Sequence, residues 1–147
     1  MEALAVPPPP EGFSLHGRTS PLTDPWAPIY AQTTAQALIL GLWAREPHVN
    51  GRGFVHGGLI MALCDNAMGL SCVQAAGGEA SMLTVNMTVD FLEAAQIGQW
   101  LTFETEFVRT GGTLAFAQAF ARADGVPCAR ANGVFRLVRR TPAPTGG

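Results

Sequence analysis

A single acidic residue, Asp65, interrupts an apolar segment that runs from Gly57 to Ala76 and contains no positively charged side chain. At helical spacing, its neighbours on the same face include the apolar residues Met61 and Met68. A carboxylate in such surroundings is costly unless it is paired, hydrogen-bonded or protonated. Asp65 therefore either meets a partner from elsewhere in the fold or is kept for chemistry, and we favour chemistry.

A glycine-rich turn precedes this acid, with Asn50 at its start and His56, Gly57 and Gly58 at its end. The two glycines lack Cβ atoms, so a ligand can approach the backbone. Amides at a helix start are also free to donate hydrogen bonds to a negatively charged group. Gly58 and Asp65 lie about 10 Å apart along one helix. A substrate atom can contact both features only if two copies of the chain share the site. Close packing of the glycines, and a structural role for His56 at the helix entrance, are the alternatives.

Other catalytic signatures are absent from the sequence. The three cysteines and three histidines show no metal-ligand spacing, and no phosphate-binding or dinucleotide-binding glycine motif occurs. Cys64 has no basic residue nearby in the sequence, so we interpret it as a small buried hydrophobic residue. We expect neither a metal nor a cofactor.

Composition restricts the class of protein. The chain has 147 residues, of which 48% are hydrophobic and 14% are charged, with a formal net charge of −2. Its nine basic residues are all arginines and are scattered, which argues against nucleic acid as a partner. The first residues resemble neither a signal nor a membrane span, and the cysteines do not suggest a disulfide framework. We expect a cytoplasmic protein without a membrane partner.

Proline and glycine positions divide the chain. We expect a proline-rich extension over residues 1–28, one domain over residues 29–140 and a flexible tail over residues 141–147. Within the domain, the patterns predict a strand, a long apolar helix and four further strands, over residues 35–44, 58–76, 81–92, 100–109, 113–122 and 126–138. Glycine pairs or an Asp-Gly pair separate several of these elements.

The order of these elements predicts the fold class. One strand, one long helix and successive hairpin strands are most simply arranged as an α+β fold, with a curved antiparallel sheet wrapped around the helix. A helix that is apolar on nearly every face must be covered on all sides. One concave sheet covers only part of it, so we expect a second subunit to cover the remainder.

The segment from Asn50 to Asp65, the strand 84–92 and the turn 109–113 resemble the hotdog-fold acyl-CoA thioesterases of the PaaI-like type. The resemblance covers about residues 38–138. It implies a sheet around a central helix, homodimers that commonly pair into tetramers, and an active site at the subunit interface. It also implies a role for each motif residue. Asp65 would be the general base or nucleophile, backbone amides at Gly57 and Gly58 would bind the thioester oxygen, and Asn50, His56 and Thr84 would assist.

The expected substrate is an acyl-CoA thioester with an aromatic or medium-length acyl group. The expected substrate-binding residues are Phe54, Met61, Met68 and Arg109. Relatives often carry basic residues where this chain has Glu93 and Gly112, which leaves the thioester carrier open. Two alternatives remain at this point: a hotdog dehydratase or hydratase, and a non-catalytic acyl-CoA sensor.

Overall fold

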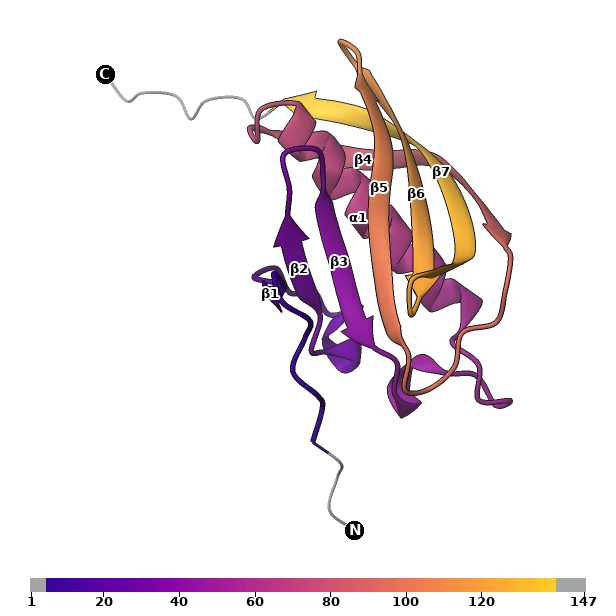
Figure 1. Ribbon diagram of the computed structural model, residues 1–147. Coiled ribbons are helices and arrows are strands. Elements are labelled where there is room, and N and C mark those ends of the chain that lie inside the picture. Colours follow the sequence, from indigo (N-terminus) through magenta and orange to yellow (C-terminus); the bar gives the residue numbers. More distant parts are fainter. Residues whose placement is uncertain (1–4, 140–147) are drawn as a thin grey trace.

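The computed structural model describes residues 5–139, in which a curved antiparallel sheet wraps around one central helix (Figure 1). The strands and helices, in chain order, are β1 (Ser14–Leu15), η1 (Asp24–Trp26), β2 (Tyr30–Thr33), β3 (Leu38–Trp43), η2 (Glu46–His48), α1 (Gly57–Ala75), β4 (Ala80–Phe91), β5 (Trp100–Thr110), β6 (Leu114–Ala123) and β7 (Val126–Arg139). The predicted helix and its four following strands are each present to within one residue at either end.

The sheet has seven strands in the order β1-β2-β3-β5-β6-β7-β4, and neighbouring strands are antiparallel. Strands β5, β6 and β7 follow one another as hairpins. The turn between β6 and β7 has positive φ angles at Asp124 (48°) and Gly125 (81°), as a two-residue type I′ turn requires. Strand β4 lies at one edge and, within residues 5–139, pairs only with β7.

Helix α1 begins and ends at the motifs expected from the sequence. His56 is its N-cap residue, and its side chain accepts a hydrogen bond from the Gly58 amide. At the other end, Gly77 and Gly78 have φ angles of 90° and 84°, and the Gly78 amide donates to the Val73 carbonyl at 2.9 Å. Side-chain-bearing residues rarely adopt these angles, so the glycine pair ends the helix.

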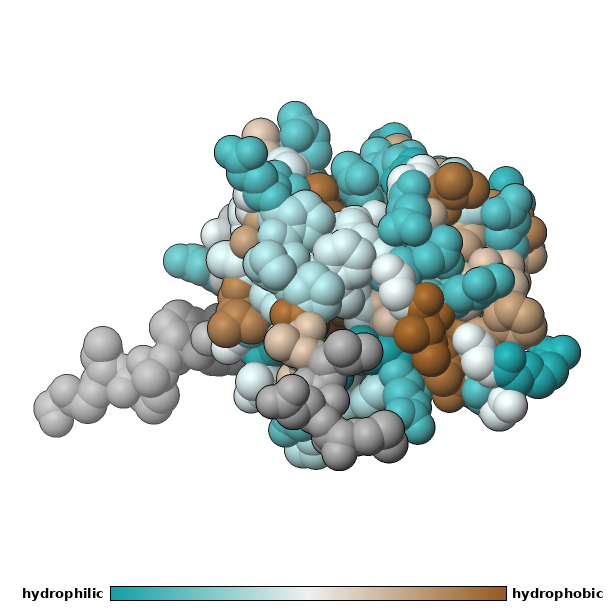
Figure 2. Space-filling model, turned by 60° about the horizontal axis from the view of Figure 1, so that its bottom comes forward, coloured by the Kyte–Doolittle hydropathy of each residue, from teal (hydrophilic) through white to brown (hydrophobic). Residues whose placement is uncertain are grey.

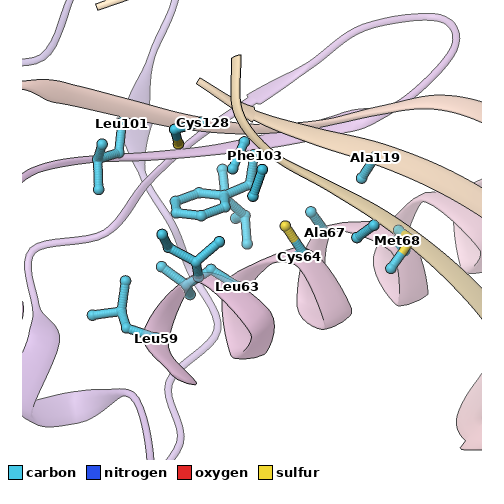
Figure 3. Close-up of a cluster of buried hydrophobic side chains, with 14 of the residues drawn as sticks. Leu59, Leu63, Cys64, Ala67, Met68, Leu101, Phe103, Ala119 and Cys128 are labelled. Carbon is cyan, nitrogen blue, oxygen red and sulfur yellow. The ribbon is translucent and has the colours of Figure 1, made fainter. Parts of the chain in front are cut away.

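The core lies between the buried face of α1 and the concave side of the sheet (Figure 3). Leu63 and Cys64 of the helix lie near Phe103 of β5, and Met68 lies on the side of Ala119 of β6. Leu63, Cys64, Met68 and Phe103 are at most 1% exposed. Much of the sheet face consists of alanines on β6 and β7, whose small side chains let the helix approach closely. By length and hydropathy alone α1 would qualify as a membrane span, but in this fold it is the core helix.

Two β-bulges change which side chains face the core. In the sequence, Leu83 and Val85 alternate with polar residues in step with the later apolar residues Met87 and Val89 of the same strand. The structure shows a bulge in β4 between Thr84 and Asn86, which leaves Leu83 and Val85 more than half exposed, whereas Met87 packs against the core. A second bulge, in β5 between Thr105 and Phe107, leaves Phe107 52% exposed. An extra residue in a strand inverts the alternation beyond it, so these apolar residues do not share one face.

The N-terminal extension joins the sheet. Strand β1 pairs with β2, a strand that the sequence patterns did not predict, and Phe13 packs edge-on against Trp100 at 5.2 Å between ring centroids. Apolar side chains still reach the surface in this part of the chain; Leu15 and Leu22 are 70% and 66% exposed. The end of the molecule in Figure 2 also shows brown apolar patches among teal polar ones. The predicted flexible tail, 141–147, lies outside the described residues.

Candidate active site

The carboxylate of Asp65 is held by a hydroxyl group. Thr84 of β4 donates a hydrogen bond from Oγ1 to Asp65 Oδ1 at 2.6 Å. Within residues 5–139, Asp65 takes part in no ion pair. Both residues line a cavity of about 410 Å³ between α1, the start of β4 and the N-terminal extension. Asp65 is therefore an accessible carboxylate with one oriented oxygen, which is the arrangement that a general base or nucleophile requires.

The bulge in β4 explains why Thr84 reaches this acid. Before the bulge, Met82 and Thr84 face the helix, and both line the cavity; beyond it, the inward positions are Met87 and Val89. Consecutive helix residues point about 100° apart. Cys64 therefore lies in the core, fully buried, whereas its neighbour Asp65 faces the cavity.

The turn at His56, Gly57 and Gly58, here called the glycine corner, has a defined hydrogen-bond pattern. His56 Nδ1 accepts from the Gly58 amide at 2.7 Å, and the His56 amide donates to the His48 carbonyl at 2.9 Å. A neutral imidazole that accepts at Nδ1 carries its proton on Nε2, so His56 retains one donor. No acceptor for the Gly57 amide occurs among the described residues.

Both glycines are also required by close packing. A Cβ at Gly58 would lie 2.8 Å from His56 Nδ1, and a Cβ at Gly57 would lie 3.0 Å from the Phe91 ring. Close packing and ligand binding are thus compatible explanations for the two glycines. Without side chains they leave room for His56 and Phe91, and they also leave the backbone open to a ligand.

Asn50 stabilises the turn that precedes the helix. Its Oδ1 accepts from the amides of Arg52 at 2.9 Å and Phe54 at 3.2 Å. Because the oxygen is used in this way, the side-chain amide nitrogen is directed elsewhere, and it has no acceptor in the described part of the chain. Asn50 can therefore serve the turn and still donate to a ligand.

In the single chain, the acid and the glycine corner line different hollows. His56 and Gly58 line a hollow of about 450 Å³ that shares no lining residue with the cavity of Asp65. The two features are about 10 Å apart along α1, as expected from the helical rise. One chain therefore does not bring them together on one substrate atom.

The four expected substrate-binding residues lie apart from the Asp65 cavity. Met68 is fully buried in the core beside Gly133, and Met61 is 39% exposed on the helix. The Arg52 guanidinium carbon lies over the Phe54 ring, 5.9 Å from the ring centroid. Arg109 is exposed near the end of β5. Of the expected site residues, the structure places Asp65 and Thr84 in contact in one group, and Asn50, His56, Gly57 and Gly58 in the other.

His48 supports the site and was not anticipated from the sequence. It is 1% exposed; its Nδ1 accepts from the Arg45 amide and its Nε2 donates to the Trp26 carbonyl, both at 2.9 Å. Burial lowers the pKa of His48, and the nearby charge of Arg45 lowers it further, while the hydrogen bond to Trp26 raises it. This neutral ring ties the loop before the glycine corner to the N-terminal extension. A histidine following a proline in a loop gives no sequence signal for such a role.

Comparison with known proteins shows the family of the chain. A model of the thioesterase superfamily matches residues 52–128, more than half of the chain. The protein named "Putative esterase PA0474" from Pseudomonas aeruginosa is 36% identical over 129 residues, which are 87% of this chain and 96% of that protein. Acyl-coenzyme A thioesterase 13 of Mus musculus is 32% identical over 84 residues, 56% of this chain and 58% of that protein. The chain belongs to the thioesterase superfamily and is a thioester hydrolase.

Solved structures are similar in fold. A hypothetical thioesterase from Streptococcus pneumoniae TIGR4, in complex with coenzyme A, matches with a TM-score of 0.69 at 19% identity, over 77% of this chain and 91% of that chain. The conserved protein PA5202 from Pseudomonas aeruginosa matches with a TM-score of 0.71 at 19% identity, over 82% and 95% of the two chains. The expectation of a hotdog fold is confirmed.

Proposed function

We propose that the protein hydrolyses acyl-CoA thioesters to the free acid and coenzyme A, with Asp65 as the catalytic carboxylate. The observation that carries this proposal is the Asp65 carboxylate, which is hydrogen-bonded by Thr84, has no ion-pair partner in residues 5–139 and opens into a cavity. The choice of coenzyme A as the carrier is supported by the acyl-coenzyme A thioesterase among the relatives and by the coenzyme A complex among the structures of the same fold.

Asp65 acts on water or directly on the thioester. As a base, it takes a proton from water while the water oxygen attacks the carbonyl carbon; the carbon–sulfur bond then breaks and the thiolate takes up a proton. As a nucleophile, it attacks the carbonyl carbon, the carbon–sulfur bond breaks and the thiolate leaves and takes up a proton; water then hydrolyses the resulting anhydride to the free acid and the Asp65 carboxylate. In both cases the Thr84 hydroxyl holds Oδ1 and leaves Oδ2 for the reaction.

The glycine corner binds the negative charge that develops on the thioester oxygen. We assign the principal donor to the Gly57 amide, whose N–H has no acceptor among the described residues. Asn50 Nδ2 and His56 Nε2 are the additional donors. The Gly58 amide is held by His56 Nδ1, so Gly58 contributes by orienting His56 as well as by admitting the substrate. Removing one such donor from an enzyme typically costs about 100-fold or more in rate.

The site requires two subunits. The acid and the glycine corner of one chain lie in separate hollows, whereas the open edge strand β4 offers a surface for a second copy, with Leu83 and Val85 exposed on it. In a two-fold dimer joined at this edge, Asp65 and Thr84 of one chain would face Asn50, His56 and Gly57 of the other. Pairing of such dimers into tetramers remains part of the proposal.

The cavity is suited to an aromatic or medium-length acyl group. Its lining along α1 extends from Leu63 to Val73, about 15 Å by the helical rise, and its volume of about 410 Å³ lies within the usual range for small-molecule sites. Leu70, Met82 and Phe135 add apolar surface.

The direct test is thioester hydrolysis by the wild-type chain and by Asp65→Asn, over a panel of acyl-CoA substrates, with release of free thiol as the readout. We expect Asp65→Asn to retain fold and binding but to lose roughly 100-fold to 10,000-fold in kcat, because asparagine neither accepts the proton nor attacks carbon. Unchanged turnover in Asp65→Asn would refute the role of Asp65.

A mixed-dimer experiment tests the shared site. Asp65→Asn and Asn50→Ala chains, each of low activity alone, are co-expressed with different tags and the mixed dimers are isolated. If each site takes Asp65 from one chain and Asn50 from the other, a mixed dimer has one intact site and about half the wild-type activity. Mixed dimers that stay as inactive as the two parents would show that both residues act within one chain.

A further inference from the structure

The cavity of Asp65 has a second wall, contributed by the N-terminal extension. The lining residues from this segment are all polar: His16, Arg18, Thr19, Ser20 and Thr23. They lie outside residues 52–128, the part of the chain that matches the family model.

The wall is held in place by the fold. The His16 amide donates to the Ile29 carbonyl at 2.9 Å, next to the pairing of β1 with β2. Ser20 and Thr23 join their hydroxyl groups at 2.9 Å, and Thr23 is only 8% exposed. The segment is thus a fixed part of the cavity.

Two polar groups of this wall have no partner within the fold. Neither the His16 ring nor the Arg18 guanidinium makes a hydrogen bond or ion pair with any residue between 5 and 139, whereas Arg122 and Arg130 are paired with carboxylates. Burial lowers the pKa of His16, and the charge of Arg18 lowers it further, so the ring is neutral near pH 7. Arg18 is exposed and also lines the cavity, which places it at the mouth.

The opposite wall, made by α1 and the sheet, is largely apolar. An acyl group bound at Asp65 would therefore have hydrocarbon on one side and polar groups on the other. The phosphates of coenzyme A are separated from the thioester by the long pantetheine arm, whereas Arg18 lines the same cavity as the reacting carboxylate. This position favours contact with the acyl group.

We propose that residues 16–23 form the acyl-selecting wall of the site and that Arg18 favours acyl groups with a carboxylate or hydroxyl at their far end. This inference rests on the proposed thioesterase function. A guanidinium without a partner among residues 5–139 can form a charge-assisted hydrogen bond with an anionic or hydroxyl oxygen, which an unsubstituted acyl group does not offer.

The test compares acyl-CoA substrates of equal length that differ only at the far end: hexanoyl-CoA against the same chain with a terminal carboxylate, and benzoyl-CoA against 4-hydroxybenzoyl-CoA. We expect wild-type kcat/KM to favour the oxygen-bearing member of at least the aliphatic pair. Arg18→Leu should shift that ratio by about two- to fivefold toward the unsubstituted chain, as expected for an exposed ion pair. Glu11→Leu, which removes a charge from the same extension outside the cavity lining, should leave the ratio unchanged.

A second arm uses the same acyl groups on N-acetylcysteamine, which lacks the phosphates. If Arg18→Leu weakens both CoA substrates equally and leaves the N-acetylcysteamine thioesters unaffected, Arg18 binds phosphate and the inference is overturned. An unchanged ratio in Arg18→Leu overturns it as well.

Binding separates this inference from the proposed function. Calorimetric affinities of the hexanoyl pair for Asp65→Asn, with and without Arg18→Leu, require no turnover. If the wild type hydrolyses no thioester but Arg18→Leu reverses the binding preference between the two hexanoyl substrates, the proposed function is refuted and the proposed role of Arg18 is supported. If turnover is normal and the binding preference does not depend on Arg18, the wall is refuted and the function stands.

Discussion

Cys64 and Asp65 are adjacent in the sequence, yet their side chains face opposite environments. Burial raises the pKa of the Cys64 thiol to about 12, with smaller contributions from Cys128 and from the negative charge of Asp65. A thiol with this pKa is almost entirely protonated at neutral pH and is a poor nucleophile. Of the two candidate nucleophiles at this point of the chain, only Asp65 is in a position to react.

His48 provides a pH-dependent contribution to stability. Its pKa is lowered in the folded protein, chiefly by burial, so the unfolded chain takes up a proton at higher pH than the folded one. The stability associated with the neutral ring is complete above the unfolded value of about 6.5 and is lost as the pH falls from there toward the folded value. We expect the free energy of unfolding to decrease as the pH falls below about 6.5, by up to about 1.4 kcal/mol per pH unit for this group.

Urea denaturation at a series of pH values measures this effect, with His48→Gln as the comparison. Because the pKa of His16 is lowered as well, the variant should have a smaller slope rather than none. An identical slope in wild type and His48→Gln would contradict the assignment.

At the scale of the elements, the two bulges decide which strand residues reach the site. The bulge in β4 turns Thr84 toward Asp65 and leaves Leu83 and Val85 outward. Period-two patterns locate a strand but do not reveal an inserted residue, because the apolar residues on both sides of the bulge continue the alternation in the sequence. The strand containing Thr84 was therefore predictable, whereas its inward face was not.

Two glycines of α1 should respond oppositely to alanine. Gly58→Ala places a Cβ 2.8 Å from His56 Nδ1, so His56 must move and the N-cap hydrogen bond is lost, which costs about 1 kcal/mol. Gly69→Ala meets only the Phe135 ring at 3.7 Å and should gain up to about 1 kcal/mol from helix propensity.

Urea or thermal unfolding of Gly58→Ala and Gly69→Ala measures the change in the free energy of unfolding of each variant. Gly58→Ala should also lower kcat, because His56 is displaced. Equal stability changes in the two variants would show that the His56 cap contributes nothing to the helix.

At the scale of the whole molecule, the exposed edge of β4 is the expected dimer contact. Leu83 is 58% exposed on this strand, and an apolar edge strand of 12 residues is an open template for pairing. Leu83→Lys should weaken the dimer by charge repulsion across the two-fold axis. Val126→Lys, at a residue 50% exposed in the turn region between β6 and β7, is the matched control.

Light scattering coupled to gel filtration measures the mass of each variant, and circular dichroism confirms the fold. We expect Leu83→Lys to shift toward monomer with a parallel loss of thioesterase activity, and Val126→Lys to remain dimeric and active. An active monomer would refute the two-subunit site.

The sequence by itself determined the central helix, its end at Gly77, the four strands after it and the family motif around Asp65. These features depend on local spacing: an apolar helical run, strand alternation and glycines at positive φ. Tertiary structure alone decided the Thr84 contact, the role of His48, the burial of Met68 and the polar wall from the extension. Each of these depends on which distant segments meet, and that is set by the bulges, the curvature of the sheet and the packing of the extension, none of which has a local pattern in the sequence.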